Sequence, residues 1–161
     1  MPQIVLKTEI DAPKSLVFDL CRNIDLHKIS ASQTGESAVA GRTTGLIELN
    51  ETVTWKARHF GMMQTLTSRI TELRYPDFFT DEMVKGPFRF FRHEHIFEDA
   101  AQRTIMTDLF EYEAPFGWLG RIADQLFLER YMTRFLSRRN RVILEFAESG
   151  QWKELPSVKK T

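Results

Sequence analysis

The sequence predicts an α+β domain in which a curved antiparallel sheet wraps around a long C-terminal helix and leaves an apolar cavity between them. Polar and apolar residues alternate over much of residues 46–112, and no helical stretch separates these strands. Strands that follow one another in this way pair antiparallel. Over residues 118–147, apolar residues instead recur every three or four positions, which is typical of a helix with one buried face. The 13 phenylalanines supply the aromatic bulk that fills a large core or lines a cavity.

The N-terminal third is expected to contain one strand and two short helices. Residues 3–10 alternate and predict the strand. Pro13 follows at a position that suits the start of a helix, and helical spacing of the next apolar residues predicts one helix there and a second over residues 25–30. Residues 30–45 are small and polar with three glycines, so they predict a mobile loop, which is also a plausible lid.

About six strands are expected between residues 46 and 112. Turn residues interrupt the alternation at Gly61 and at residues 75–76, 86–87 and 98–99. With the elements before and after it, this meander gives the order β-α-α-β6-α. The concave face of such a twisted sheet is the available surface on which a long helix can bury its apolar stripe.

The predicted terminal helix runs without proline from residue 118 to about 147 and ends at residues 149–150. Residues 1–150 are therefore expected to form a single domain, and residues 151–161 a polar tail. Several arginines of this helix are expected to lie on a solvated face, namely Arg130, Arg134, Arg138, Arg139 and Arg141.

Composition excludes several functional classes. The formal net charge is zero, which argues against a general affinity for nucleic acid or for an anionic membrane surface. The charged, alternating N-terminus is not a signal peptide, and no apolar run approaches the roughly 20 residues that span a bilayer. A single cysteine, Cys21, cannot form an internal disulfide, which suits a reducing compartment. We expect a soluble cytoplasmic protein with no integral membrane contact.

Five short motifs occur in a characteristic order. They are residues 10–13 (IDAP) leading into Val17 and Phe18, residues 86–88 (GPF), residues 92–97 (RHEHIF), residues 112–117 (YEAPFG) and residues 119–121 (LGR) before the arginine-rich helix. Over roughly residues 3–148 this order resembles the START-like (SRPBCC) superfamily of helix-grip proteins, which includes polyketide cyclases, aromatase domains and lipid carriers. The resemblance is strongest to its small ligand-binding domains. It implies a helix-grip fold with an internal cavity, but no particular reaction, because one scaffold carries many functions.

Alternation also predicts which side chains face the cavity. His93 and His95 are two residues apart in a strand, so they leave the same face of the sheet as Phe91 and Phe97. On the same parity, Asp81, Asp108 and Tyr112 face inward. The candidate ligand-binding residues are Trp55, His59, Phe79, Met83, Phe91, His93, His95, Phe97, Asp108 and Phe110 from the sheet, with Leu126, Arg130 and Met132 from the helix.

Three interpretations of the polar candidates remain open. The histidines and acids can satisfy one another as buried polar groups. They can orient a polar group of a hydrophobic or aromatic ligand, lipid-like or polyketide-like, that the cavity binds. In the third interpretation the protein is an enzyme of the cyclase or dehydratase type, in which His93, His95 and Asp108 move protons. A regulatory interaction protein with a collapsed cavity is a further alternative.

Other features support no additional chemistry. The spacing His93-x-His95 suits a metal, but it is common and matches no fuller ligand pattern, so we expect no metal and no cofactor. Cys21 is expected to be a structural thiol. Phe90 and Phe91 cannot both point inward, and an outward ring would mark a contact in a possible homodimer.

Overall fold

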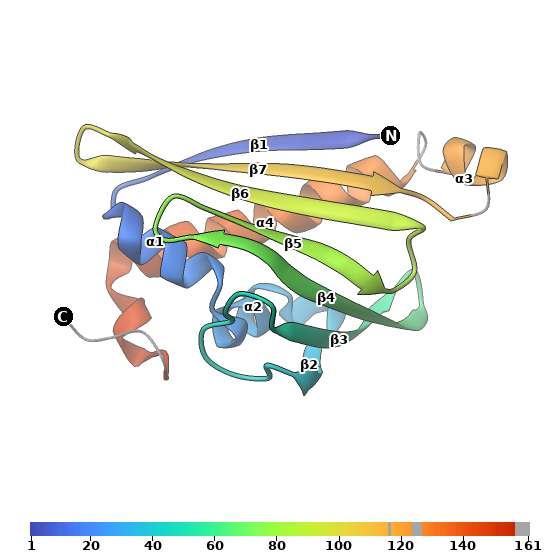
Figure 1. Cartoon of the computed structure of the whole chain (residues 1–161), viewed down its shortest axis with the longest axis horizontal. Coiled ribbons are helices and arrows are strands. Elements are labelled where there is room, and N and C mark those ends of the chain that lie inside the picture. The colour runs from blue at the N-terminus through green and yellow to red at the C-terminus, as the bar shows by residue number, and fades with distance from the viewer. Residues whose placement is uncertain (116, 124–126, 157–161) are drawn as a thin grey trace.

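Seven strands form one curved sheet in the order β1-β7-β6-β5-β4-β3-β2 (Figure 1). The computed structural model describes residues 1–115, 117–123 and 127–156. Every neighbouring pair of strands is antiparallel, and β1, the first strand, pairs with β7, the last. The strands are β1 (Gln3–Ile10), β2 (Ser37–Gly41), β3 (Thr52–His59), β4 (Met62–Arg74), β5 (Phe78–Lys85), β6 (Phe90–Ala100) and β7 (Arg103–Glu113).

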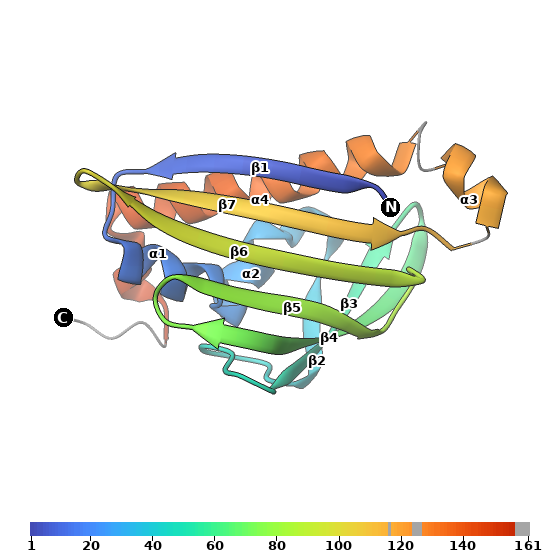
Figure 2. The same cartoon turned by 45° about the horizontal axis from the view of Figure 1, so that its top comes forward.

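Three helices lie on one face of this sheet, which curves in front of them in Figure 2. They are α1 (Lys14–Cys21), α2 (Ile24–Ser30) and α4 (Glu129–Ser149), and α1 and α2 both pack against α4. The Asn23 side chain caps α2 by accepting a 2.9 Å hydrogen bond from the Leu26 amide. At the far end, Gly150 ends α4 with a φ of 80°, a conformation that glycine adopts without strain.

The alternation of β6 directs four side chains toward the helices. Phe91, His93, His95 and Phe97 are buried, whereas the residues between them are partly exposed. His93 lies opposite Asp81 of β5 on one side and opposite Phe110 of β7 on the other. The register of three adjacent strands therefore brings two histidines and an acid together on the covered face.

Two apolar clusters fill the space between the sheet and the helices. The larger surrounds Phe18 of α1, which is fully buried, and includes Phe79 and Phe97. The smaller surrounds Phe91 and includes Phe110, Tyr112 and Leu136 of α4. Members of both clusters line the pocket described below.

The fold class predicted from the sequence is confirmed, including the order of elements through β7. The six strands after the two short helices begin earlier than expected, because only β3 to β7 lie in the predicted range of residues 46–112 and β2 precedes it. The single helix predicted over residues 118–147 is wrong in its first part, because the structure describes a separate helix α3 (Gly117–Ala123) before α4. Trp118, Leu119 and Ile122 of α3 are exposed, so they do not continue the buried stripe of α4.

Three local predictions also need correction. Residues 30–45 are more than a loop, because they contain a 3-10 turn at Ser32–Thr34 and β2, which pairs with the edge of β3 across a bulge at residues 38–40. The turn expected at residues 98–99 lies at residues 101–102, where Ala101 has a φ of 57°. The predicted tail begins as a packed segment, since Leu155 is buried in the larger cluster.

None of the helices in the described part of the chain combines the length and apolarity needed to cross a bilayer.

Candidate functional site

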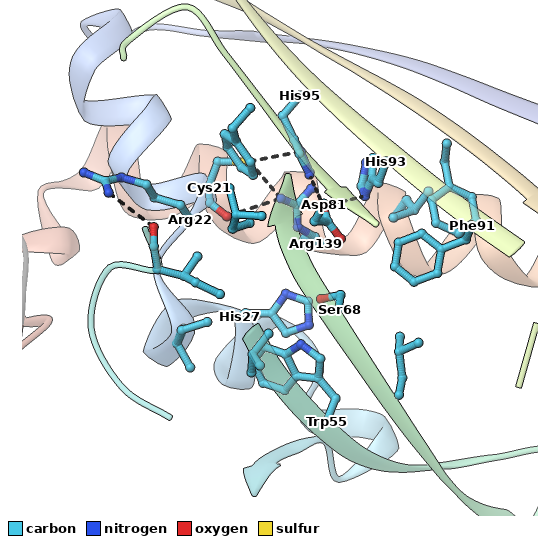
Figure 3. Close-up of a pocket in the computed structure, with 18 of the residues that line it drawn as sticks. Cys21, Arg22, His27, Trp55, Ser68, Asp81, Phe91, His93, His95 and Arg139 are labelled. Carbon is cyan, nitrogen blue, oxygen red and sulfur yellow. Dashed lines mark hydrogen bonds and ion pairs between the residues drawn. The ribbon is translucent and has the colours of Figure 1, made fainter. Parts of the chain in front are cut away.

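A pocket of about 130 Å³ lies between the sheet and the three covering helices (Figure 3). Most of its wall is apolar, and a few polar groups gather at two places. Such an arrangement is typical of sites that bind small organic molecules. The apolar and aromatic residues of the wall are Ile24, Ile47, Val53, Trp55, Leu66, Ile70, Phe79, Phe88, Phe91, Phe110, Met132, Phe135 and Leu136.

The first polar group joins the two histidines of β6 to two carboxylates. His95 Nε2 lies 2.8 Å from Asp81 Oδ1, and His93 Nε2 lies 2.9 Å from Asp108 Oδ1. His95 Nδ1 also lies 3.2 Å from the same Asp108 oxygen. Both imidazole rings therefore donate to Asp108, while Asp81 accepts from His95 on the pocket side. We call these four residues the His–Asp cluster.

Arg139 and Asn140 of α4 complete the surroundings of Asp108. Arg139 Nη1 donates to Asp108 Oδ1 at 3.2 Å, and Asn140 Nδ2 donates to Asp108 Oδ2 at 2.6 Å. Arg139 Nη2 donates to Cys21 Sγ at 2.7 Å, and that sulfur lies 3.5 Å from His95 Nδ1. The long helix is thus joined to the sheet and to α1 by buried polar contacts as well as by apolar packing.

Burial and neighbouring charges give the members of the His–Asp cluster different protonation states. Burial raises the pKa of Asp108, but its hydrogen bonds from His93 and His95 and the charge of Arg139 hold that pKa well below its usual value. Burial also opposes a charge on His95, yet the surrounding Cys21, Asp108 and Asp81 raise its pKa well above the ordinary value. Burial and the neighbouring His95 lower the pKa of His93 to about 4.

Asp81 stays ionised as well, because the hydrogen bond from His95 and nearby positive charge outweigh the effect of burial and lower its pKa. Near neutral pH the pocket end therefore holds two carboxylates, a charged His95 and a charged Arg139. These four charges sum to zero, and the imidazole of His93 remains neutral beside them. The arrangement is electrically balanced despite its burial, as buried charges need to be.

The second polar group lies on the other side of the pocket, where α2 faces β3. The His27 ring packs on Trp55 with 4.3 Å between centroids, and His27 Nε2 lies 3.4 Å from Glu36 Oε1. Among the described residues, Glu36 Oε2 and Asn23 Nδ2 are buried with no hydrogen-bond partner. All four residues line the pocket, so this side of it carries an amide, a carboxyl group and an imidazole beside the Trp55 ring.

The structure places about half of the sequence-predicted ligand residues on the pocket wall. They are Trp55, Phe79, Phe91, His93, His95, Phe110 and Met132. Asp108 does not line the pocket and lies behind residues that do, namely His93, His95 and Arg139. Leu126 lies outside the described residues.

Four other candidates lie elsewhere. Phe97 packs against Phe18 in the core, with 5.2 Å between ring centroids. Met83 is partly buried against the smaller apolar cluster. Arg130 is exposed on the first turn of α4 because it lies outside the buried stripe of that helix. His59 lies at the end of β3, where its Nδ1 is 2.6 Å from the Tyr131 hydroxyl.

Sequence reasoning missed the role of Arg139, which it assigned to a solvated face. Arg139 is only 6% exposed, whereas Arg130, Arg134, Arg138 and Arg141 are exposed as expected. The spacing contains the signal that identifies it, since Leu136, Ile143 and Ala147 are the buried positions of α4 and residue 139 falls on the same stripe. His27 and Glu36 were missed because no pattern links a helix residue to one in an irregular segment.

His59 supplies a prediction about pH. Half-burial lowers its pKa, so the folded protein resists protonation of this ring more than the unfolded chain does. The neutral ring's contribution to stability is complete above the unfolded pKa of about 6.5 and decreases as the pH falls below it. An NMR titration is expected to give a His59 midpoint below 6.5. Because the Tyr131 hydroxyl contacts the His59 ring, Tyr131→Phe should change this midpoint more than the surface change Tyr75→Phe does. A midpoint at or above 6.5 would contradict the burial described here.

Comparisons with known proteins place the fold. The family model "Polyketide cyclase / dehydrase and lipid transport" matches residues 10–148. The crystal structure of TTHA0849 from Thermus thermophilus is similar with a TM-score of 0.75 at 16% identity, covering 92% of this chain and 99% of that one. No curated protein matches the sequence.

Two further solved structures share the architecture. The Zhui aromatase/cyclase from Streptomyces sp. R1128 has a TM-score of 0.71 at 15% identity, covering 98% of this chain and 99% of its own. The ginseng major latex-like protein 151 from Panax ginseng has a TM-score of 0.66 at 14% identity, covering 91% and 97%. Identities this low show the fold alone. With the family model spanning most of its length, the chain belongs to the polyketide cyclase/dehydrase and lipid transport family.

Proposed function

We propose that this protein binds a small hydrophobic or aromatic molecule whose polar group faces the His–Asp cluster. The observation that carries the proposal is the pocket itself, where the rings of Trp55, Phe79 and Phe91 surround a space with charged groups at one end. Aromatic walls favour the body of such a ligand through apolar burial. Arg139 and His93 line the same space and offer a donor and a neutral imidazole to its polar group.

The volume limits the size of the ligand. A pocket of about 130 Å³ is close to the cavity of roughly 150 Å³ that binds benzene in an engineered protein. Drug-sized ligands occupy about 300–1,000 Å³. The pocket in this form therefore suits a single ring with a polar substituent. A lipid or a fused polyketide requires side chains such as Met132 and Phe135 to move aside.

The alternative is a cyclase or dehydratase in which the His–Asp cluster moves protons. The 2.9 Å contact between His93, which lines the pocket, and Asp108 behind it favours this alternative. Against it, a pKa of about 4 makes His93 a weak base at neutral pH. His95 is also unsuited, because both of its ring nitrogens face acceptor groups. Binding without turnover is the better-supported function.

Trp55 fluorescence provides a direct test. Phenol, benzoate and toluene are titrated into the protein, and Trp55→Phe identifies the part of the signal that comes from the pocket. Saturable binding of phenol or benzoate, tighter than that of toluene, is the expected result, because only these two carry a polar group for the cluster. Native mass spectrometry of freshly purified protein should in addition detect a co-purifying molecule.

A filled pocket is the matched control. Ser68 is buried on the pocket wall, so Ser68→Leu is expected to lower the affinity for phenol by at least about tenfold, or about 1.4 kcal/mol. The same change at exposed Ser37 of β2 should have no effect. Equal affinities in the two variants would place the binding elsewhere. Turnover of an added cyclic substrate that His93→Gln abolishes would establish the enzymatic alternative.

A further inference from the structure

Three side chains of β5 and β6 point their ligating atoms at one place beside the pocket (Figure 3). The ligating atoms of Asp81, His93 and His95 all lie within 4.8 Å of one another. Asp81 Oδ1 is 2.8 Å from His95 Nε2 and 3.9 Å from His93 Nδ1. In a tetrahedral site with bonds of about 2.0–2.1 Å, ligand atoms are about 3.3 Å apart. The two distances bracket that value, so small side-chain rotations suffice to admit an ion.

The outer nitrogens of both rings are already fixed. His93 Nε2 and His95 Nδ1 lie 2.9 Å and 3.2 Å from the same oxygen of Asp108. Histidines that bind metals nearly always donate their other ring N–H to a carboxylate, a carbonyl or water, which fixes the ring and its tautomer. Here one buried carboxylate serves both rings. The nitrogens that face Asp81 are the ones left for an ion.

Asp108 is itself held in place by contacts that an ion would not disturb. Arg139 and Asn140 donate to its two oxygens from α4. Cys21 Sγ approaches His95 at Nδ1, so it lies at the outer nitrogen and is not a further ligand. Once the proton on His95 Nε2 is released, Asp81 and Asp108 carry two negative charges against the single charge of Arg139, which favours a bound cation.

The geometry points to a binding site for one divalent transition-metal ion, with Asp81, His93 and His95 as ligands and Asp108 orienting both histidines. Two imidazoles and one carboxylate suit zinc, iron(II), cobalt or nickel better than calcium or magnesium. Three protein ligands leave at least one coordination position open, and all three ligands line the pocket. On binding, the proton between His95 Nε2 and Asp81 Oδ1 leaves to solvent and the ion takes its position.

From the sequence alone, no metal site is expected at the His-x-His pair, because no third ligand can be identified there. The third ligand comes from the neighbouring strand, where Asp81 pairs with His93 in the β5–β6 register. The inference does not depend on the proposed organic ligand, because an ion can bind whether or not that ligand does.

Cobalt titration tests the site on the full chain. The protein is treated with a chelator, dialysed and titrated with Co²⁺ while visible absorption is recorded. One equivalent should produce d–d bands that Zn²⁺ removes at equal stoichiometry, and Zn²⁺ alone should raise the Tm, because an ion that binds only the folded state stabilises it. Binding below one equivalent, or bands that appear only with a large excess of metal, would overturn the assignment.

Variants locate the ion. His93→Ala and Asp81→Asn are each expected to weaken cobalt binding at least about 100-fold, since even outer-shell partners are worth 10–100-fold. Asp81→Asn keeps the shape of a partly exposed side chain, so it serves if His93→Ala fails to fold, as judged by circular dichroism. His59→Ala removes a histidine of the same sheet and should leave binding unchanged. Unchanged binding in Asp81→Asn, or loss in His59→Ala, would contradict the site.

Discussion

Asp108→Asn is expected to destabilise the protein by about 3–5 kcal/mol, as measured by urea unfolding at neutral pH. The Asp108 side chain is 1% exposed and accepts from His93, His95, Arg139 and Asn140. Asparagine keeps the shape but has one acceptor oxygen and no charge. It therefore leaves the buried guanidinium of Arg139 without its carboxylate and sets an amide N–H against another donor. Removing one partner of a buried ion pair typically costs this much.

A double-mutant cycle separates the ion pair from the rest of the cluster. Arg139→Met removes the buried charge that Asp108→Asn leaves without a partner. The double variant should therefore be destabilised by clearly less than the sum of the two single changes. Asp99→Asn is the matched control, because Asp99 is exposed and its contact with Lys14 is screened by water. Additive effects in the cycle, or a loss below about 1 kcal/mol in Asp108→Asn, would contradict the buried network.

Phe18→Ala is expected to have an effect of similar size, about 3–5 kcal/mol, for a different reason. Phe18 is fully buried, and its ring contacts Tyr75, Phe79 and Phe97 with 5.2–5.3 Å between centroids. Truncation leaves a cavity between the sheet and α1, because these elements cannot move toward each other far enough to fill it. Phe79 stacks on His95 at 4.1 Å, so the loss of packing should also loosen the pocket wall.

The control for this prediction is the same change on the surface. Phe127 is 68% exposed, and Phe127→Ala is expected to change the stability by no more than about 0.5 kcal/mol. Phe18→Ala should also weaken the binding of phenol to the pocket, whereas Phe127→Ala should not. A stability loss below about 1.5 kcal/mol in Phe18→Ala would mean that the core repacks around the missing ring.

The sequence predicts the sheet well because alternation is a local property. Phe91, His93, His95 and Phe97 could be assigned to the covered face from their spacing alone, and the structure buries all four. The alternation predicts which face of the sheet a side chain occupies, but it does not predict where along the strand the pocket lies. Phe97 and Met83 share that face and lie in or against the apolar clusters, yet neither lines the pocket.

Residues brought together by the fold were harder to identify. Arg139 lies between Arg138 and Asn140, and such a polar run is typical of a solvated face. Its burial can be recognised only when each position is compared with the apolar stripe of α4. The partnership of Asp81 with the histidines depends on the register between β5 and β6, which the bulges of the neighbouring β4–β5 pair make difficult to count from the sequence. The contact between His27 and Glu36 depends on the path of an irregular segment, for which no periodicity exists.

The pairing of β1 with β7 has a consequence for the order of events during synthesis. Residues 3–10 find their partners at residues 104–111, about a hundred positions later. At 5–20 residues per second, a ribosome needs roughly 5–20 s to make the intervening chain. During that time Ile4 and Ile10, both buried in the finished protein, have no strand to shield them. Contacts this distant slow folding, so the nascent chain passes through an interval in which its first segment is a natural target for chaperones.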